Sequence, residues 1–182
     1  MTLEELALQG KTTKHNSMAA GITSRLLDIR KSNIQQCLSD FQNIEHRLES
    51  VSTIHGIEFI NDSKATKINS TWYALESINK PIIWIAGGED NGNDYSKLIP
   101  LVQEKVKAII CIGKDNTKII KEFSGIFDTI YETQSMEEAV KGAYSLAENN
   151  HAVLLSPACN SFDLFKNYDD RGDQFKYFTR KI

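Results

Sequence analysis

The sequence FINDSKATKINST at residues 59–71 concentrates chemically active side chains immediately after an apolar run. Its segment NDSKAT (61–66, the NDSKAT turn) contains an acid, an amine and two hydroxyls, among them Asp62, Lys64 and Thr66. A plain turn needs only one or two of Gly, Asn or Asp, so a change of chain direction alone does not account for these groups. We therefore expect the NDSKAT turn to belong to a binding or catalytic site.

A second polar segment, the glycine turn (87–94), follows the apolar run IIWIA. Its glycines, Gly87 and Gly88, would let the backbone approach a ligand closely, but a simple tight turn explains them as well. The segment lacks the G-x-G-x-x-G spacing, so it does not predict a dinucleotide-binding fingerprint. Alone, the glycine turn leaves both interpretations open.

A third polar segment, SPACNS (156–161, the SPACNS turn), follows the apolar run AVLL. We expect a helix to open near Asn160, and helix amino termini bind carboxylates and phosphates through free N–H groups and a positive partial charge. Ser161 would add a hydroxyl donor to such an anion site. The alternative is that Asn160 and Ser161 only cap the helix.

Apolar β-branched runs alternate with helical patterns from about residue 56 onward. Strands are predicted at 57–61, 82–86, 108–112, 126–131 and 152–155. Helices are predicted at 69–79, 94–105, 115–123, 135–149 and 160–180. This alternation predicts an α/β, three-layer Rossmann-like fold, in which helices cover both faces of a mostly parallel sheet. The three polar turns would then converge at the carboxyl edge of that sheet, where open α/β sheets bind ligands.

The segment LESVSTIHGIEF (48–59) interrupts this alternation, because it contains two short strand patterns in succession. The dipeptide His55-Gly56 between them is typical of a tight turn. We expect an antiparallel hairpin at the edge of the sheet.

The first 43 residues show no strand pattern. Asn16 can cap a helix on which Met18, Ile22 and Leu26 share one face, and a second short helix is expected at 32–38. Two helices without a sheet make a poor domain. We therefore expect 1–43 to be a helical remnant of a preceding domain, and 44–182 to form the main one.

The composition excludes several classes of protein. The chain has 182 residues, of which 41% are hydrophobic and 25% charged, and its net charge is −3 without a basic block that would suit nucleic acid. No apolar run approaches the length of a membrane span, so we expect no membrane insertion. The three cysteines are far apart, which favours a reducing, cytoplasmic location, and we expect a monomer.

Three short patterns do not support the functions that they first suggest. GKTT (10–13) matches the end of a phosphate-binding P-loop, but the glycine required five positions before Gly10 is replaced by Glu5. RGD (171–173) falls inside a predicted helix, which argues against a role in adhesion. The histidines show no metal-ligand spacing, so we expect no metal site within the chain; they are His15, His46, His55 and His151.

Taken in order and spacing, four segments resemble the signatures of the Mur ligases, and among them those that add D-glutamate to a peptidoglycan precursor. The segments are EHRLE (45–49), INDSKAT (60–66), GG followed by NDYSKL (87–98), and LLSPACNSFDLFKNYDDRGDQF (154–175). The resemblance covers 44–182 closely, and residues 10–43 resemble the end of the family's central ATP-binding domain.

The resemblance implies ATP-driven amide formation. A substrate carboxylate of UDP-N-acetylmuramoyl-L-alanine is phosphorylated, and the amine of D-glutamate then attacks the acyl phosphate. Carried over by position, Lys64 and Thr66 would face the reacting groups, with Thr66 also contacting D-glutamate. Ser161 and the backbone N–H of Tyr168 would hold the side-chain carboxylate of D-glutamate.

The resemblance also implies nucleotide contacts. Arg47 would contact the phosphates of ATP, Asp62 its ribose, and Asn16 its adenine. The P-loop and the main Mg²⁺ ligands of the family belong to a domain outside this chain, in agreement with the failed P-loop at 10–13. We therefore expect the chain alone to form no product.

The sequence departs from the family pattern in three places. Lys67 stands where the family usually has asparagine, and Asn91 stands where it has a lysine that pairs with the α-carboxylate of D-glutamate. Thr12-Thr13 replaces a His-Asn pair, which affects the proposed adenine contact. We hypothesise that Lys67 reaches the pocket and partly replaces the charge missing at Asn91; the alternative is that Lys67 points to solvent.

Residues and resemblance together predict the amino-acid-accepting part of a D-glutamate ligase. A competing interpretation is a non-catalytic α/β ligand-binding module that kept the fold but lost the chemistry. Asn91 favours that alternative, whereas the intact NDSKAT and SPACNS turns favour the ligase.

Overall fold

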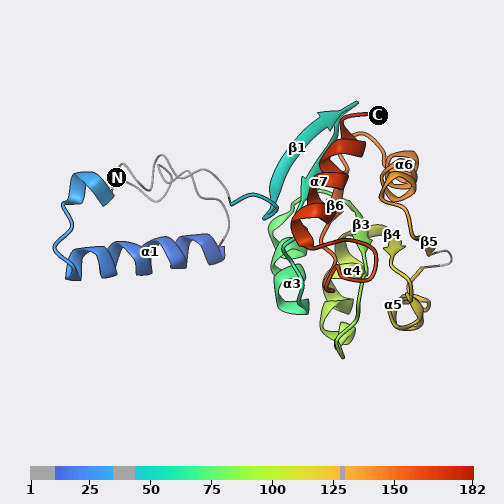
Figure 1. Cartoon of the computed structure of the whole chain (residues 1–182), viewed down its shortest axis with the longest axis horizontal. Helices are drawn as coiled ribbons and strands as arrows, with labels where there is room; N and C mark the ends of the chain where they lie inside the picture. Colours follow the sequence, from blue (N-terminus) through green and yellow to red (C-terminus); the bar gives the residue numbers. More distant parts are fainter. Residues whose placement is uncertain (1–10, 35–43, 128–129) are drawn as a thin grey trace. The chain divides into compact units, whose positions relative to one another are not determined.

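The computed structural model describes residues 11–34, 44–127 and 130–182, and the chain divides into two compact units, Met1–Ile44 and Glu45–Ile182. In the first unit, helix α1 spans Lys11–Leu26 (Figure 1). The prediction that Asn16 caps this helix is wrong, because Asn16 lies inside α1. An asparagine inside a helix costs only a fraction of a kcal/mol, so a residue that can cap a helix need not begin one.

A second helical segment of the first unit covers 31–34. It overlaps the helix expected at 32–38, of which 35–38 lie outside the described residues. Within the described ranges, no helix is both long and apolar enough to cross a bilayer.

The second unit is built on a six-stranded sheet with the order β1-β2-β6-β3-β4-β5. Its strands are β1 (Glu49–Ile54), β2 (Ile57–Asn61), β3 (Ile82–Ala86), β4 (Val106–Ile112), β5 (Tyr131–Thr133) and β6 (Ala152–Leu155). Only the edge pair β1–β2 is antiparallel. His55 and Gly56 turn this hairpin with φ angles of 48° and 80°, the left-handed backbone that a tight hairpin turn requires. The mostly parallel sheet and the edge hairpin are confirmed.

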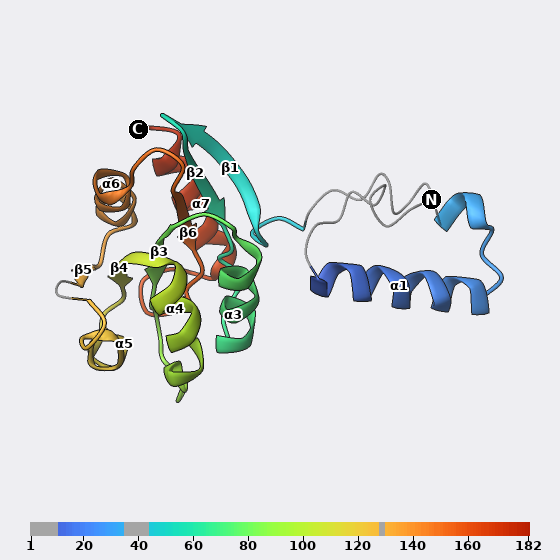
Figure 2. The ribbon, with the colours of Figure 1, turned by 180° about the vertical axis from the view of Figure 1, so that it is seen from behind.

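Helices cover both faces of the sheet (Figure 1 and Figure 2). One face packs against α3 (Ile68–Ser77), the 3₁₀ helix η2 (Tyr95–Leu98), α4 (Ile99–Lys105) and α5 (Thr117–Phe123). The other packs against α6 (Met136–Leu146) and α7 (Tyr168–Thr179). Because both faces are covered, the central strand β3 is apolar at every position, with Trp84 on one face and Ile83 and Ile85 on the other.

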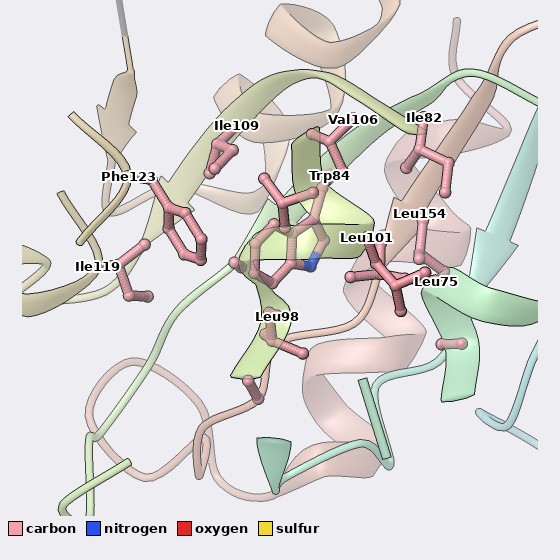
Figure 3. Packing of buried hydrophobic residues seen from close by; sticks show 14 of the residues in the cluster. Leu75, Ile82, Trp84, Leu98, Leu101, Val106, Ile109, Ile119, Phe123 and Leu154 are labelled. Atoms are coloured by element: carbon pink, nitrogen blue, oxygen red, sulfur yellow. The ribbon is translucent and has the colours of Figure 1, made fainter. Parts of the chain in front are cut away.

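Trp84 connects this core to the carboxyl edge of the sheet. Its ring is fully buried and stands edge-on to Phe123, with centroids 5.6 Å apart (Figure 3). Its Nε1–H donates to the carbonyl oxygen of Ser156 over 2.8 Å. Burial of the ring therefore fixes the first residue of the SPACNS turn.

Two predicted elements are displaced. The strand expected at 126–131 is found at Tyr131–Thr133, because Ile126 and Phe127 close the end of α5 by donating their N–H groups to the Phe123 carbonyl. The last helix begins at Tyr168 instead of near residue 160, since Asn160 is engaged in a β-bridge with Glu89.

Candidate active site

The three polar turns meet at one edge of the sheet, as predicted. They follow β2, β6 and β3, which are neighbours in the sheet. The N–H of Ala158 in the SPACNS turn donates to the Ala65 carbonyl of the NDSKAT turn over 2.9 Å. The SPACNS turn also contacts the glycine turn. Asn160 of the SPACNS turn and Glu89 of the glycine turn exchange two backbone hydrogen bonds, of 3.0 and 3.2 Å. The turns therefore form one continuous hydrogen-bonded surface.

Gly87 and Gly88 of the glycine turn each lie against a neighbouring backbone that leaves no room for a side chain. Gly88 has a φ of 126°, and a Cβ at this position would lie 2.1 Å from the carbonyl oxygen of Asn160. Gly87 has a φ of 117°, and its Cβ would lie 2.6 Å from the carbonyl oxygen of Ile112. The structural interpretation of the glycine turn therefore accounts for both residues.

Arg171, on α7, joins the NDSKAT turn to the SPACNS turn. Its side chain is fully buried. Its guanidinium donates to the Ser63 hydroxyl (3.0 Å) and carbonyl (2.9 Å), and to the carbonyls of Cys159 (3.1 Å) and Asn160 (3.2 Å). Burial lowers the pKa of Arg171 to about 10, so the group stays charged at neutral pH. Its hydrogen-bond acceptors among the described residues are all neutral, and the Asp163 carboxylate acts on it only through charge, so Arg171 contributes a buried positive charge at this edge.

The sequence interpretation missed Arg171, because RGD was considered only as an adhesion motif. A signal was present in the helical spacing. Arg171, Phe175 and Thr179 recur every four residues, and all three are buried on one face of α7. An arginine within such a buried stripe requires internal acceptors, and these are found in the two turns.

The start of α7 brings Lys64 and Tyr168 together. The Ser63 hydroxyl donates to the Tyr168 carbonyl over 2.7 Å, and the exposed Lys64 ammonium lies 5.5 Å from the centroid of the Tyr168 ring. Tyr168 is the first residue of α7, so its N–H has no acceptor within the helix. The nearby Thr66 is partly exposed. An amine, a hydroxyl and a backbone N–H without an acceptor in the described part of the chain thus lie close together here.

The helix expected to open at the SPACNS turn is absent, so Ser161 caps no helix there. Asn167 caps α7 instead, and its side chain accepts from the Asp170 N–H over 2.8 Å. Ser161 is only 2% exposed, and no acceptor or donor for its hydroxyl is found in the described part of the chain. Both interpretations based on a helix start are wrong, but Ser161 remains a hydroxyl without another assigned partner.

Asp62 is buried, and both of its carboxylate oxygens are engaged. One accepts from the Leu48 N–H over 3.3 Å, and the other from the Ser156 hydroxyl over 2.8 Å. Burial raises the pKa of Asp62 to about 7, despite these hydrogen bonds and the charge of Arg47, which lower it. Each oxygen has a second lone pair, so a further donor could still be accepted.

Lys67 and Asn91 are both exposed. The backbone of Lys67 precedes α3 without a capping hydrogen bond from its side chain. A different lysine reaches the glycine turn: the Lys118 ammonium, from α5, lies 3.4 Å from the Asp90 carboxylate beside Asn91. The sequence interpretation missed Lys118, although it follows β4 at the same edge of the sheet.

Arg171→Lys should lower the free energy of unfolding by about 2–4 kcal/mol, because a single ammonium cannot satisfy carbonyls that face in different directions. The matched control is Arg180→Lys, at the exposed end of α7. Urea denaturation followed by tryptophan fluorescence measures both. Equal effects of the two substitutions would contradict the assigned role of Arg171.

Asp62→Asn should remove a pH dependence of stability. The carboxyl has its ordinary pKa of 3.8 in the unfolded chain and a pKa of about 7 in the folded one, so the free energy of unfolding falls as pH rises through this window. Above pH 7 the variant should be more stable by about 3 kcal/mol, after a small loss of hydrogen bonding.

The control for this experiment is Asp94→Asn. The Ser96 hydroxyl lowers the pKa of the exposed Asp94, so removing that carboxyl should leave the loss of stability between about pH 4 and 7 in place. Urea denaturation at a series of pH values gives both profiles. A wild-type stability that does not fall in this window would refute the burial argument.

The chain is similar in sequence to a known protein family. A family model described as "Mur ligase, glutamate ligase domain" matches residues 46–159. The chain is 56% identical over 182 residues to the UDP-N-acetylmuramoylalanine–D-glutamate ligase of Christiangramia forsetii, and 50% identical over 183 residues to that of Bacteroides thetaiotaomicron. Both alignments cover the whole chain, but it spans only 41% of each relative.

Solved structures show the same fold at low sequence identity. MurF from Acinetobacter baumannii matches with a TM-score of 0.70 and 16% identity, over 96% of this chain and 39% of that one. Folylpolyglutamate synthase from Mycobacterium tuberculosis matches with a TM-score of 0.71 and 11% identity, over 95% and 41%. Since the family model matches more than half of the residues and includes the NDSKAT and glycine turns, the chain belongs to the Mur ligase family, through its glutamate ligase domain.

Proposed function

We propose that this chain is the D-glutamate-accepting part of an ATP-dependent ligase that joins D-glutamate to UDP-N-acetylmuramoyl-L-alanine in peptidoglycan synthesis. The observation that carries the proposal is the fusion of three polar turns at one sheet edge around the buried cation Arg171. A fixed positive charge in a region of low dielectric attracts an anionic amino acid. The names of the relatives at 50% and 56% identity support D-glutamate as that amino acid.

In this proposal, each reactive group of the edge has a role in amide formation. Ser161 and the Tyr168 N–H hold the side-chain carboxylate of D-glutamate, and Thr66 contacts the amino acid. Lys64 lies near the reacting groups and stabilises negative charge on the acyl phosphate. The amine attacks the acyl carbonyl, phosphate leaves with the electrons of the broken C–O bond, and the amine loses a proton as the amide forms.

ATP supplies the phosphoryl group that activates the carboxylate. We propose that Arg47 contacts its phosphates, Asp62 its ribose and Asn16 its adenine. Residues 1–43 would then be the end of the central ATP-binding domain, and 44–182 the carboxyl-terminal domain. We also propose a cytoplasmic monomer, without nucleic-acid partners.

Mg²⁺ accompanies ATP in this chemistry, and we propose that its ligands lie mainly outside this chain. Among the described residues, one group of three metal-type ligands occurs: Glu45, His46 and Asp173. It does not fit Mg²⁺, because the Lys176 ammonium already binds the carboxylates of Glu45 and Asp173. A hard cation that prefers oxygen ligands would have to displace this ammonium.

The competing proposal, a non-catalytic binding module, is motivated by Asn91. It predicts that the full-length protein releases no ADP when D-glutamate and UDP-N-acetylmuramoyl-L-alanine are supplied. Release of ADP that depends on both substrates would exclude it.

Ser161→Ala in the full-length ligase should raise the KM for D-glutamate and spare the KM for ATP. A hydrogen bond to a charged group contributes about 1.5–3 kcal/mol, which corresponds to a roughly ten- to hundredfold change. Ser145→Ala, an exposed serine of α6, is the matched control. An unchanged KM for D-glutamate would remove Ser161 from the site.

The Lys67 hypothesis predicts coupling between positions 67 and 91. With Asn91 present, Lys67→Asn should raise the KM for D-glutamate about tenfold, since the α-carboxylate of D-glutamate would lose the cation that pairs with it. Once Asn91→Lys is introduced, the same change should have little effect. A double-mutant cycle measures this difference.

Additive effects in that cycle would contradict compensation by Lys67. In that case the KM for D-glutamate should be measured for Lys118→Gln, and an increase would show that Lys118 supplies the positive charge. Because Lys118 lies beside Asp90, it is the alternative source of positive charge at the glycine turn.

A further inference from the structure

Arg47 stands between two residues with left-handed backbone. The φ angles of His46 and Leu48 are 61° and 46°. Such conformations cost about 1–3 kcal/mol each in residues other than glycine, and for a bulky residue such as leucine they are rare. They persist only where the surrounding structure holds them. The Arg47 side chain itself is exposed, so this segment (45–49, the Arg47 loop) presents a cation on a constrained backbone.

His46 anchors the first half of the Arg47 loop. Its side chain is buried, and its Nδ1 lies 2.9 Å from the Asn61 side-chain amide. The ring packs so tightly on α7 that a Cβ at Gly172 would lie 2.2 Å from the imidazole Nδ1. The His46 carbonyl accepts from the N–H of Lys64 in the NDSKAT turn over 3.0 Å.

His46 supports the Arg47 loop through packing and hydrogen bonding. The Asn61 side-chain oxygen accepts from the Ser63 N–H over 3.1 Å, so the Asn61 NH₂ group is the one that faces His46 Nδ1. In the neutral ring, Nδ1 then accepts a hydrogen bond and Nε2 carries the proton. Nε2 faces the carboxylates of Asp169 and Asp173 at 3.9 and 3.8 Å.

Two carboxylates, one in the NDSKAT turn and one at the first residue of β1, also hold the backbone of the Arg47 loop. The Leu48 N–H donates to the Asp62 carboxylate over 3.3 Å, and the His46 N–H donates to the Glu49 carboxylate over 3.0 Å. The loop also meets α7, which packs beside β1 and β2 (Figure 1), through the ion pair of Glu45 and Lys176. Backbone constraint on both sides limits where the Arg47 guanidinium can lie.

We infer that His46 is a positioning residue for Arg47: wedged between Asn61 and Gly172, it holds the left-handed loop that directs the Arg47 guanidinium toward the ATP phosphates. The inference rests on the proposed nucleotide role of Arg47. It also connects the two halves of the site, because Gly172, against which His46 packs, directly follows Arg171 in α7.

A double-mutant cycle in the full-length ligase tests this inference, with the KM values for ATP and D-glutamate as readouts. Arg47→Ala should raise the KM for ATP about ten- to hundredfold, as expected for a charged hydrogen bond. His46→Ala should raise it by about tenfold and change the KM for D-glutamate less than twofold. In the Arg47→Ala background, His46→Ala should add less than about twofold, because it acts through Arg47.

The control is His55→Ala. His55 also has left-handed backbone, but it lies at the opposite end of the same hairpin, so its replacement should leave both KM values unchanged. If His46→Ala does not fold, His46→Asn replaces it, since asparagine tolerates left-handed backbone but is too short to fill the space against Gly172. It should raise the KM for ATP and show the same non-additivity.

The outcomes separate the inference from the proposed function. If Arg47→Ala raises the KM for ATP but the His46 effect persists in full in its background, the positioning role is refuted and the nucleotide role of Arg47 stands. If Arg47→Ala leaves the KM for ATP unchanged, both are refuted.

Discussion

A buried guanidinium must satisfy its N–H groups inside the protein, and this constraint organises the carboxyl edge of the sheet. Removing an arginine from water is costly unless acceptors are placed around it. Here the acceptors are backbone carbonyls and a hydroxyl of the NDSKAT and SPACNS turns, which belong to neighbouring strands. Arg171 therefore fixes the distance between two loops and contributes positive charge to the surface that they form.

Helix α7 supports several parts of the candidate site, because successive residues along it contact different segments. Tyr168 presents its backbone N–H at the start of the helix, Arg171 joins the turns, and Gly172 receives the ring of His46. Further along, Lys176 binds Glu45 at the beginning of the second unit. Groups proposed to hold an amino acid and a nucleotide are thus supported by a single rigid element.

The sequence predicted the sheet, the hairpin and the meeting of the three turns, because these depend on local patterns and on the parallel arrangement of strands. It could not predict where the last helix begins. Asn160 has the side chain of a helix cap, but its backbone pairs with Glu89, a residue 71 positions earlier in the chain. Long-range pairing of this kind leaves no local signal.

The candidate site was predicted only in part, because some of its residues are placed by contacts between segments distant in the sequence. Lys64, Thr66 and Ser161 lie in turns that are visible as polar segments, whereas Arg171, Lys118 and His46 act through contacts between elements distant in the chain. The left-handed backbone beside Arg47 was also not predicted, since neither His46 nor Leu48 is a glycine, the residue that most readily adopts it.

We propose that the edge organised by Arg171 accepts the amino acid, and a crystal structure of the full-length protein with D-glutamate bound would show whether it does. We expect the side-chain carboxylate of D-glutamate within about 3.2 Å of the Ser161 hydroxyl and the Tyr168 N–H, while the Arg171 guanidinium keeps its contacts with Ser63 and Cys159. D-glutamate bound away from all three turns would contradict this proposal.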